Sequence, residues 1–72
     1  MELGKAKKIL EREKNVIKVE YLRKAKIVKV YTINNELSPS LLINLFPNSR
    51  ISVEQNNFLG IVNYTHTIIL RK

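Results

Sequence analysis

Cysteine and tryptophan are absent from the 72-residue chain, and glycine and proline occur only twice each. Without cysteine the chain has neither a disulfide framework nor a thiolate metal site, so packing or a partner must stabilise the fold. The two glycines, Gly4 and Gly60, are too few and too far apart for a glycine-rich phosphate-binding loop. These absences exclude disulfide scaffolds, cysteine-based zinc modules and glycine-rich nucleotide-binding loops.

Long hydrophobic runs are also lacking. No apolar run approaches the roughly 20 residues that a membrane-spanning helix needs, and the charged N-terminus has no apolar segment of the signal-peptide kind. Hydrophobic residues make up 44% of the chain, which is ordinary for a globular protein. We therefore expect a single cytoplasmic domain, residues 1–72, near the size at which one core is only marginally sufficient.

Positive charge is abundant. The net charge is +7, and its distribution is uneven. Residues 1–29 contain ten of the thirteen cations and carry +6, whereas residues 30–70 carry −1. A charge of this density attracts polyanions on electrostatic grounds alone, and its concentration in one half of the chain favours a nucleic-acid-binding surface over a merely solubilising one.

The first half of the chain predicts one helix and two strands. Residues 2–14 place Leu3, Ala6 and Leu10 on one side at helical spacing. Residues 16–22 alternate apolar with charged side chains and are rich in β-branched residues, which favours a strand, although a continued helix is the competing interpretation. A basic connection over residues 23–26 then leads into a second strand.

The second half predicts a short helix and two further strands. The second strand is predicted over residues 27–33 and is followed by a loop over residues 34–36. Ser38 and Pro39 then have the pattern of an N-cap followed by proline at the first helical position. Pro47 is expected to end this helix at or before Phe46.

Residues 50–55 alternate as a strand, and Asn56-Asn57 is the candidate for a two-residue turn. Residues 58–70 would then form a long last strand, in which Gly60 or residues 63–66 mark a bulge. The order is therefore α-β-β-α-β-β, an α+β domain with helices packed on a mostly antiparallel sheet.

The candidate phosphate-binding residues are cations that a helix ridge, a tight connection and two strands would hold in register. They are Lys5, Lys8, Arg12, Lys18, Arg23, Lys24, Lys26 and Lys29. Tyr21 and Tyr31 lie among them as candidates for stacking on unpaired bases, against the more common role of a tyrosine that packs in the core and exposes its hydroxyl.

No catalytic or metal-binding pattern is present. His66 is the single histidine and has no nearby second ligand, so we expect a structural residue on the last strand. The acids form no catalytic pair. We expect no enzyme activity, no cofactor and no small-molecule substrate.

Two hypotheses follow. The first is a small basic nucleic-acid-binding accessory protein of a nucleoprotein assembly, with structured RNA favoured over DNA by analogy with small basic ribosomal proteins. The second is an accessory subunit of a multisubunit DNA- or RNA-processing enzyme, or a homodimer, that docks through its apolar C-terminal half. Its candidate partner-binding residues are Leu41, Leu42, Leu45, Phe46 and Phe58. A DNA-binding repressor is a third class, but two strands separate the helices, so a helix-turn-helix is not expected.

Overall fold

The computed structural model describes residues 3–70, which form two helices and four strands. In chain order these are α1 (Leu3–Glu11), β1 (Val16–Leu22), β2 (Ile27–Ile33), α2 (Pro39–Leu45), β3 (Arg50–Phe58) and β4 (Ile61–Ile69). The α+β class and the order α-β-β-α-β-β predicted from the sequence are confirmed.

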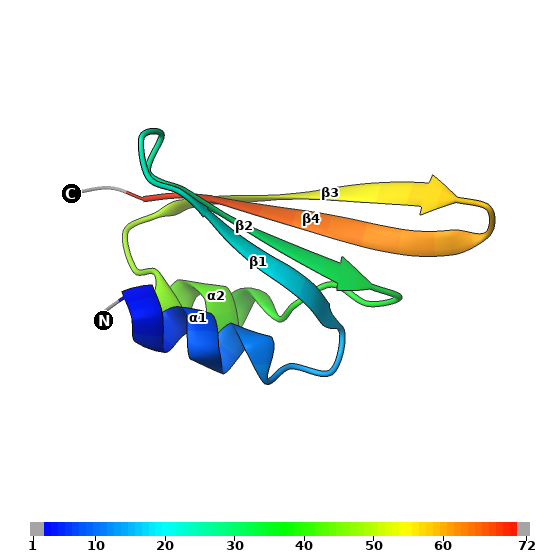
Figure 1. Cartoon of the computed structure of the whole chain (residues 1–72), viewed down its shortest axis with the longest axis horizontal. Coiled ribbons are helices and arrows are strands. Elements are labelled where there is room, and N and C mark those ends of the chain that lie inside the picture. The colour runs from blue at the N-terminus through cyan, green and yellow to red at the C-terminus, as the bar shows by residue number, and fades with distance from the viewer. Residues whose placement is uncertain (1–2, 71–72) are drawn as a thin grey trace.

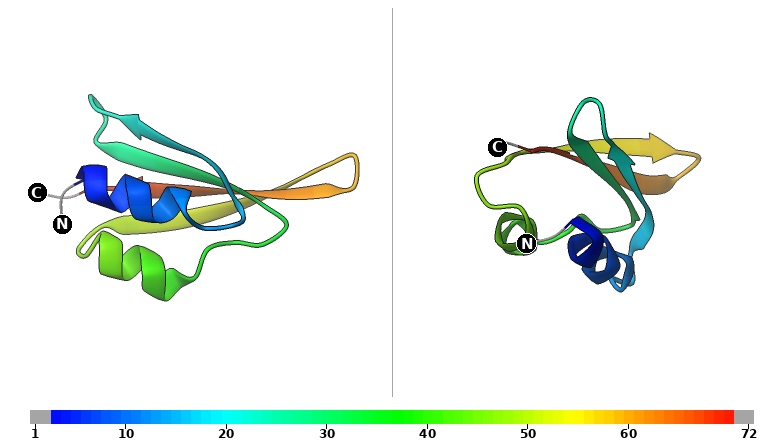
Figure 2. Two further views of the ribbon diagram at one scale, coloured as in Figure 1. Left: turned by 60° about the horizontal axis from the view of Figure 1, so that its bottom comes forward. Right: turned by 60° about the vertical axis from the view of Figure 1, so that its left-hand side comes forward.

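The four strands form one antiparallel sheet in the order β1-β2-β4-β3. Both helices lie on the same side of this sheet (Figures 1 and 2). The other side is covered by neither, and we call it the open face. Strand β2 shows the alternation clearly, because Val28, Val30 and Thr32 are buried under the helices while Lys29 and Tyr31 are partly exposed on the open face.

The core lies between the two helices and the sheet, with its fully buried strand residues on the central strands β2 and β4. Helix α1 contributes Ala6 and Leu10, and α2 contributes Leu42 and Leu45. The remaining buried hydrophobic residues are Val28, Val30, Leu37, Phe46 and Ile68. Each helix is short, so tertiary packing of its apolar side stabilises it more than intrinsic propensity does.

The β3–β4 hairpin extends well past the helices (Figure 1). We call residues 55–64 of this hairpin the arm. Every β3 residue of the arm is exposed, and the tip carries Phe58, Leu59 and Ile61 with 68%, 85% and 47% of their surfaces exposed. The arm therefore presents apolar side chains without a helix to cover them.

Helix α1 is shorter than the helix predicted over residues 2–14. It ends at Glu11, and the amides of Arg12 and Glu13 bond to carbonyls only three residues back, a tightening typical of a helix end. The physical reason is that Glu13 and Lys14 offer no apolar side chain to the core after Leu10. Residue 2 lies outside the described residues.

The predicted turn at Asn56-Asn57 is wrong, because both residues continue β3 and pair with Val62 and Asn63. The turn is Leu59-Gly60, whose φ angles of 52° and 81° suit a type I′ hairpin. Gly60 is therefore a turn residue and no bulge. A turn at 56–57 would have left the end of β4, including the buried Ile68, without a β3 partner.

Other predicted boundaries are confirmed. Strands β1 and β2 have the predicted limits, with a register shift in β1 between Val16 and Lys18. Ser38 is the N-cap of α2 and Pro39 is its first residue, although the Ser38 side chain makes no capping hydrogen bond. The helix ends at Leu45, just before Phe46 and Pro47.

Candidate nucleic-acid interface

The β1–β2 turn holds three cations on a fixed backbone. The amide of Lys26 donates to the carbonyl of Arg23 at 3.3 Å, and the carbonyl of Lys26 accepts a hydrogen bond from the amide of Leu70 at 2.9 Å. Arg23, Lys24 and Lys26 are all exposed. The turn therefore combines solvent-accessible charge with a backbone tied to the end of β4.

A fourth cation, Arg50, is far from the turn in the sequence, and strand pairing places it at the same end of the sheet. Leu22 pairs with Ile27, Ile27 with Ile69, and Ile69 with Arg50. This row places Arg50 across three strand spacings, about 14 Å, from the end of β1. We call the set Arg23, Lys24, Lys26 and Arg50 the basic end. The sequence gives no signal for Arg50, since it stands far from the basic segment and in a nearly neutral half.

The described carboxylates lie away from the basic end. Glu11 is the last residue of α1, Glu13 lies in the α1–β1 connection, and Glu36 is in the β2–α2 connection. Figure 1 shows both connections at the side of the body opposite the β1–β2 turn. Glu20 and Glu54 lie mid-strand, with Glu20 opposite Lys29 and Glu54 opposite Thr65. Within residues 3–70, the turn therefore carries cations and no acid.

The middle of the open face is a mixed cluster. Lys18 and Tyr31 are cross-strand partners, as are Glu20 and Lys29. The Tyr31 hydroxyl donates to Glu20 Oε1 at 3.3 Å, and Lys18 Nζ lies 4.0 Å from Glu20 Oε2. Desolvation, the Glu20 charge and this hydrogen bond together raise the pKa of Tyr31. Glu20 thus offsets part of the charge of Lys18 and Lys29.

The helix ridge lies in the other layer of the molecule. Lys5 and Lys8 on α1, and Arg12 just after its end, are exposed. Helix α1 lies on the covered side of the sheet (Figure 2), whereas Lys18 and Lys29 lie on the open face, where they pair with Tyr31 and Glu20. Arg12 also lines a depression together with Glu13 and Glu36. The structure does not bring the eight predicted cations onto one surface. The cations of the β1–β2 turn lie next to those of the open face, and the helix ridge of Lys5, Lys8 and Arg12 is separate from both groups.

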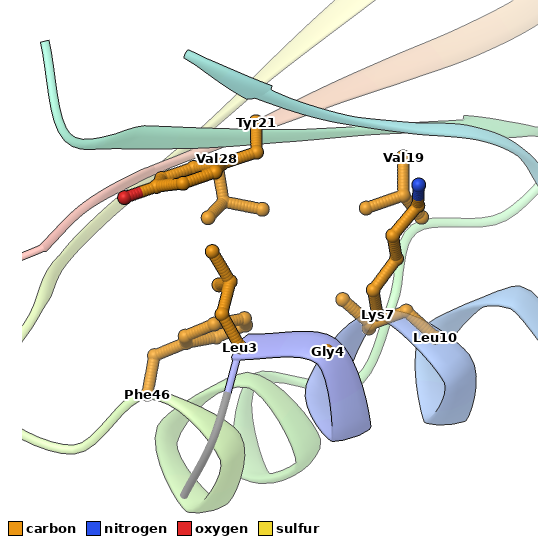
Figure 3. Close-up of a pocket in the computed structure, with 8 residues that line it drawn as sticks. All are labelled: Leu3, Gly4, Lys7, Leu10, Val19, Tyr21, Val28 and Phe46. Carbon is orange, nitrogen blue, oxygen red and sulfur yellow. The ribbon is translucent and has the colours of Figure 1, made fainter. Parts of the chain in front are cut away.

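Tyr21 and Tyr31 lie on opposite faces of the sheet. Tyr21 pairs with Val28, and Figure 3 shows its side chain at a pocket between α1 and β1. The pocket has a volume of about 190 Å³, and its lining is mostly apolar, with Lys7 as the one charged residue among those that line it. Tyr21 therefore lines this pocket on the helix side of the sheet with 38% of its surface exposed, and of the two tyrosines only Tyr31 lies on the open face.

Three of the five candidate partner-binding residues are core residues. Leu42, Leu45 and Phe46 are 1%, 5% and 6% exposed, and Leu41 packs against them. Leu42, Leu45 and Phe46 support the sheet and are not accessible to a partner in this fold, whereas Leu41 is partly buried. Phe58 is exposed at the arm tip.

His66 is buried on β4, facing the helices. Its Nε2 accepts a hydrogen bond from the amide of Leu37 at 2.9 Å, and its Nδ1 lies 3.1 Å from the carbonyl oxygen of Val30. These partners assign the proton to Nδ1. With both ring nitrogens engaged, the imidazole joins β2, β4 and the segment that leads into α2.

Within residues 3–70, no group of three or more metal-ligating side chains is positioned to hold a metal ion, and neither helix has the length and apolar character needed to cross a membrane. Comparison with known proteins found no matching family model, no matching curated protein and no matching solved structure.

Proposed function

We propose that this protein is a small, non-catalytic nucleic-acid-binding protein that contacts phosphates through its basic end and acts as an accessory piece of a nucleoprotein assembly. The observation that carries the proposal is the concentration of Arg23, Lys24 and Lys26 on the β1–β2 turn, whose backbone is hydrogen-bonded to the end of β4. Within residues 3–70, no acidic residue lies on this turn. Phosphate binding needs cations held in register on a rigid support, and this turn meets that requirement.

Structured RNA or another duplex suits this surface better than an extended single strand. Proteins that bind single strands combine a cationic groove with several aromatic stacking platforms. Among residues 3–70, Tyr31 is the one aromatic side chain on the open face near the cations, and its hydroxyl donates a hydrogen bond to Glu20. Recognition would therefore depend on phosphate charge and shape. Lys18 and Lys29 extend the contact area onto the open face.

The backbone of Lys26 supports a role for its side chain. Lys26 has a φ of 55°, a left-handed conformation that costs about 1–2 kcal/mol for a residue with a Cβ. Glycine or asparagine would relieve this cost. Because strained residues are concentrated at functional sites, we propose that Lys26 supplies one of the phosphate contacts.

The experiment compares two variants with equal loss of charge. The first carries Arg23→Gln, Lys24→Gln and Lys26→Gln at the turn. The matched control carries Lys8→Gln in the last turn of α1, with Arg12→Gln and Lys14→Gln in the mixed-charge segment that follows it. Binding to a labelled RNA hairpin, a DNA duplex and a single strand is measured by fluorescence anisotropy over a range of salt. Each lost phosphate contact should reduce the slope of log affinity against log salt by about 0.9 on duplex DNA and about 0.7 on a single strand.

We expect the turn variant to lose both affinity and slope, and the control to keep most of each. Equal losses in both variants would show that net charge alone attracts the polyanion, and absence of binding by the unaltered protein at low salt would refute the proposal. Lys26→Gly separates the charge of this residue from its backbone conformation, because binding should weaken while folding stability is maintained or increased.

The arm supports a second candidate function, docking to a protein partner as an accessory subunit. Its tip exposes Phe58, Leu59 and Ile61 together on a projecting hairpin, and clustered exposed apolar side chains mark interaction sites. Copurification from the native extract with added nuclease tests it. A partner that survives nuclease but is lost with Phe58→Ser supports docking, and partners lost with nuclease alone support the first function.

A further inference from the structure

Strand β3 is an edge strand without the usual protection against pairing. It has nine residues, a continuous register with β4 and no proline. The opposite edge, β1, is interrupted by a register shift and carries Lys18 and Glu20 close together. Charges, prolines and bulges are the devices that keep sheet edges from pairing with other chains. Strand β3 has no proline and no bulge, and its two charged residues, Arg50 and Glu54, are opposite in sign, so this edge is open to a complementary strand.

The hairpin turn fixes which residues of β3 offer their backbone to a partner. Phe58 and Ile61 flank the two-residue turn, so they form a hydrogen-bonded pair, and every second residue back along β3 also bonds to β4. The intervening residues, Ile51, Val53, Gln55 and Asn57, direct their N–H and C=O groups outward. An antiparallel partner strand must therefore bond to these odd-numbered residues.

We propose that the partner is a second copy of this chain, joined through antiparallel pairing of residues 50–54 around a twofold axis at Ser52. In this register Ile51 faces the partner's Val53, and Arg50 faces the partner's Glu54. The interface is self-complementary, as a twofold interface must be. Because cross-strand partners share a face, the Ile51–Val53 pairs extend the helix-side core and the charged pairs lie on the open face.

Charge selects this register among those that the backbone allows. Centring on Glu54 would place two Glu54 carboxylates opposite each other, and centring on Val53 or Gln55 would leave both charges opposite uncharged residues. Within one chain, Arg50 and Glu54 are about 13 Å apart at strand spacing, and no ion pair to either occurs among the described residues. In the proposed register each is in a non-hydrogen-bonded pair, where side chains approach most closely.

The dimer would contain one eight-stranded sheet whose two open faces lie on the same side. The β1–β2 turns remain exposed, since β4 lies between β2 and the paired β3. Of the basic end, only Arg50 is engaged by the partner copy, and Arg23, Lys24 and Lys26 stay free to contact phosphate. The inference does not depend on nucleic-acid binding, and it is tested on protein freed of nucleic acid.

Analytical ultracentrifugation of the full chain over a range of concentrations measures the dissociation constant. Arg50→Glu alone, or Glu54→Arg alone, turns two attractive pairs into two repulsive pairs and should raise that constant about tenfold or more. The double variant, Arg50→Glu with Glu54→Arg, restores opposite charges in both pairs and should recover the dimer. A merely structural role of either residue would not produce this rescue.

A backbone variant and a matched control test the register further. Val53→Pro removes an outward N–H that β4 does not use, a position where an edge strand tolerates proline, and should abolish the dimer. Asn57→Pro makes the same change outside the paired segment and should leave the dimer intact. A protein that stays monomeric at every concentration overturns the inference, as does a dimer that neither single charge substitution weakens.

Discussion

Thr32→Val should stabilise the protein, although it removes a polar group from the interior. Thr32 is fully buried on β2, and its Oγ1 has no hydrogen-bond partner among the described residues. Mutational data give a cost of about 1–3 kcal/mol for burying an unpaired hydroxyl. Valine has nearly the same shape and no hydroxyl, so we expect the free energy of unfolding to rise by about 1 kcal/mol, from a total of roughly 4 to 11 kcal/mol for a chain of this length.

His66→Leu is the opposing case in the same layer of the core. His66 is as deeply buried as Thr32, but both of its ring nitrogens have partners. Leucine fills a similar volume and leaves the buried amide of Leu37 without an acceptor, which costs about 1–3 kcal/mol. One polar-to-apolar substitution should therefore stabilise the fold, and the other should destabilise it.

Urea denaturation followed by circular dichroism measures both changes. With a denaturant slope near 1 kcal/mol per molar for a small domain, the two midpoints should move in opposite directions by about 1 M or more. Hydrogen exchange of the Leu37 amide provides a local measurement, and its protection should fall only in His66→Leu. A loss of stability in Thr32→Val, or unchanged Leu37 protection in His66→Leu, would refute the reasoning.

Two further predictions concern the arm and the open face. Leu59 is 85% exposed and has a φ of 52°, so Leu59→Asn should raise the unfolding free energy by about 1 kcal/mol in the same urea assay, whereas a decrease would contradict the turn assignment. The raised pKa of Tyr31 means that the folded state favours the neutral phenol. This contribution to the free energy of unfolding is fully present below the pKa of tyrosine in the unfolded chain, near 10, and is lost as the pH rises through the pKa of Tyr31 in the folded protein. Spectroscopic titration of Tyr31 should therefore show ionisation above the ordinary range, and Glu20→Gln should lower the midpoint; an unchanged midpoint would exclude the Glu20 contribution.

Local patterns in the sequence determined most of the elements. The β-branched alternation of residues 16–22 and 27–33 predicted β1 and β2 with their observed limits, and the Ser38-Pro39 and Pro47 signals bounded α2. Such patterns succeed because each depends on neighbours in the chain, through steric preference, capping and proline geometry. The concentration of positive charge in the first half was likewise visible without coordinates.

Only the tertiary structure decided the hairpin turn and the grouping of the cations. Asn56-Asn57 is a plausible turn locally, but the pairing of Ile51 with Ile68 over the core requires the turn at Leu59-Gly60. The alternation of side chains along β2 places Lys29 on the face of the sheet opposite the helix ridge. The order of the strands in the sheet brings Arg50 to the basic end. These outcomes depend on register and layer order, which are set by contacts between residues far apart in the chain and therefore leave no local signal.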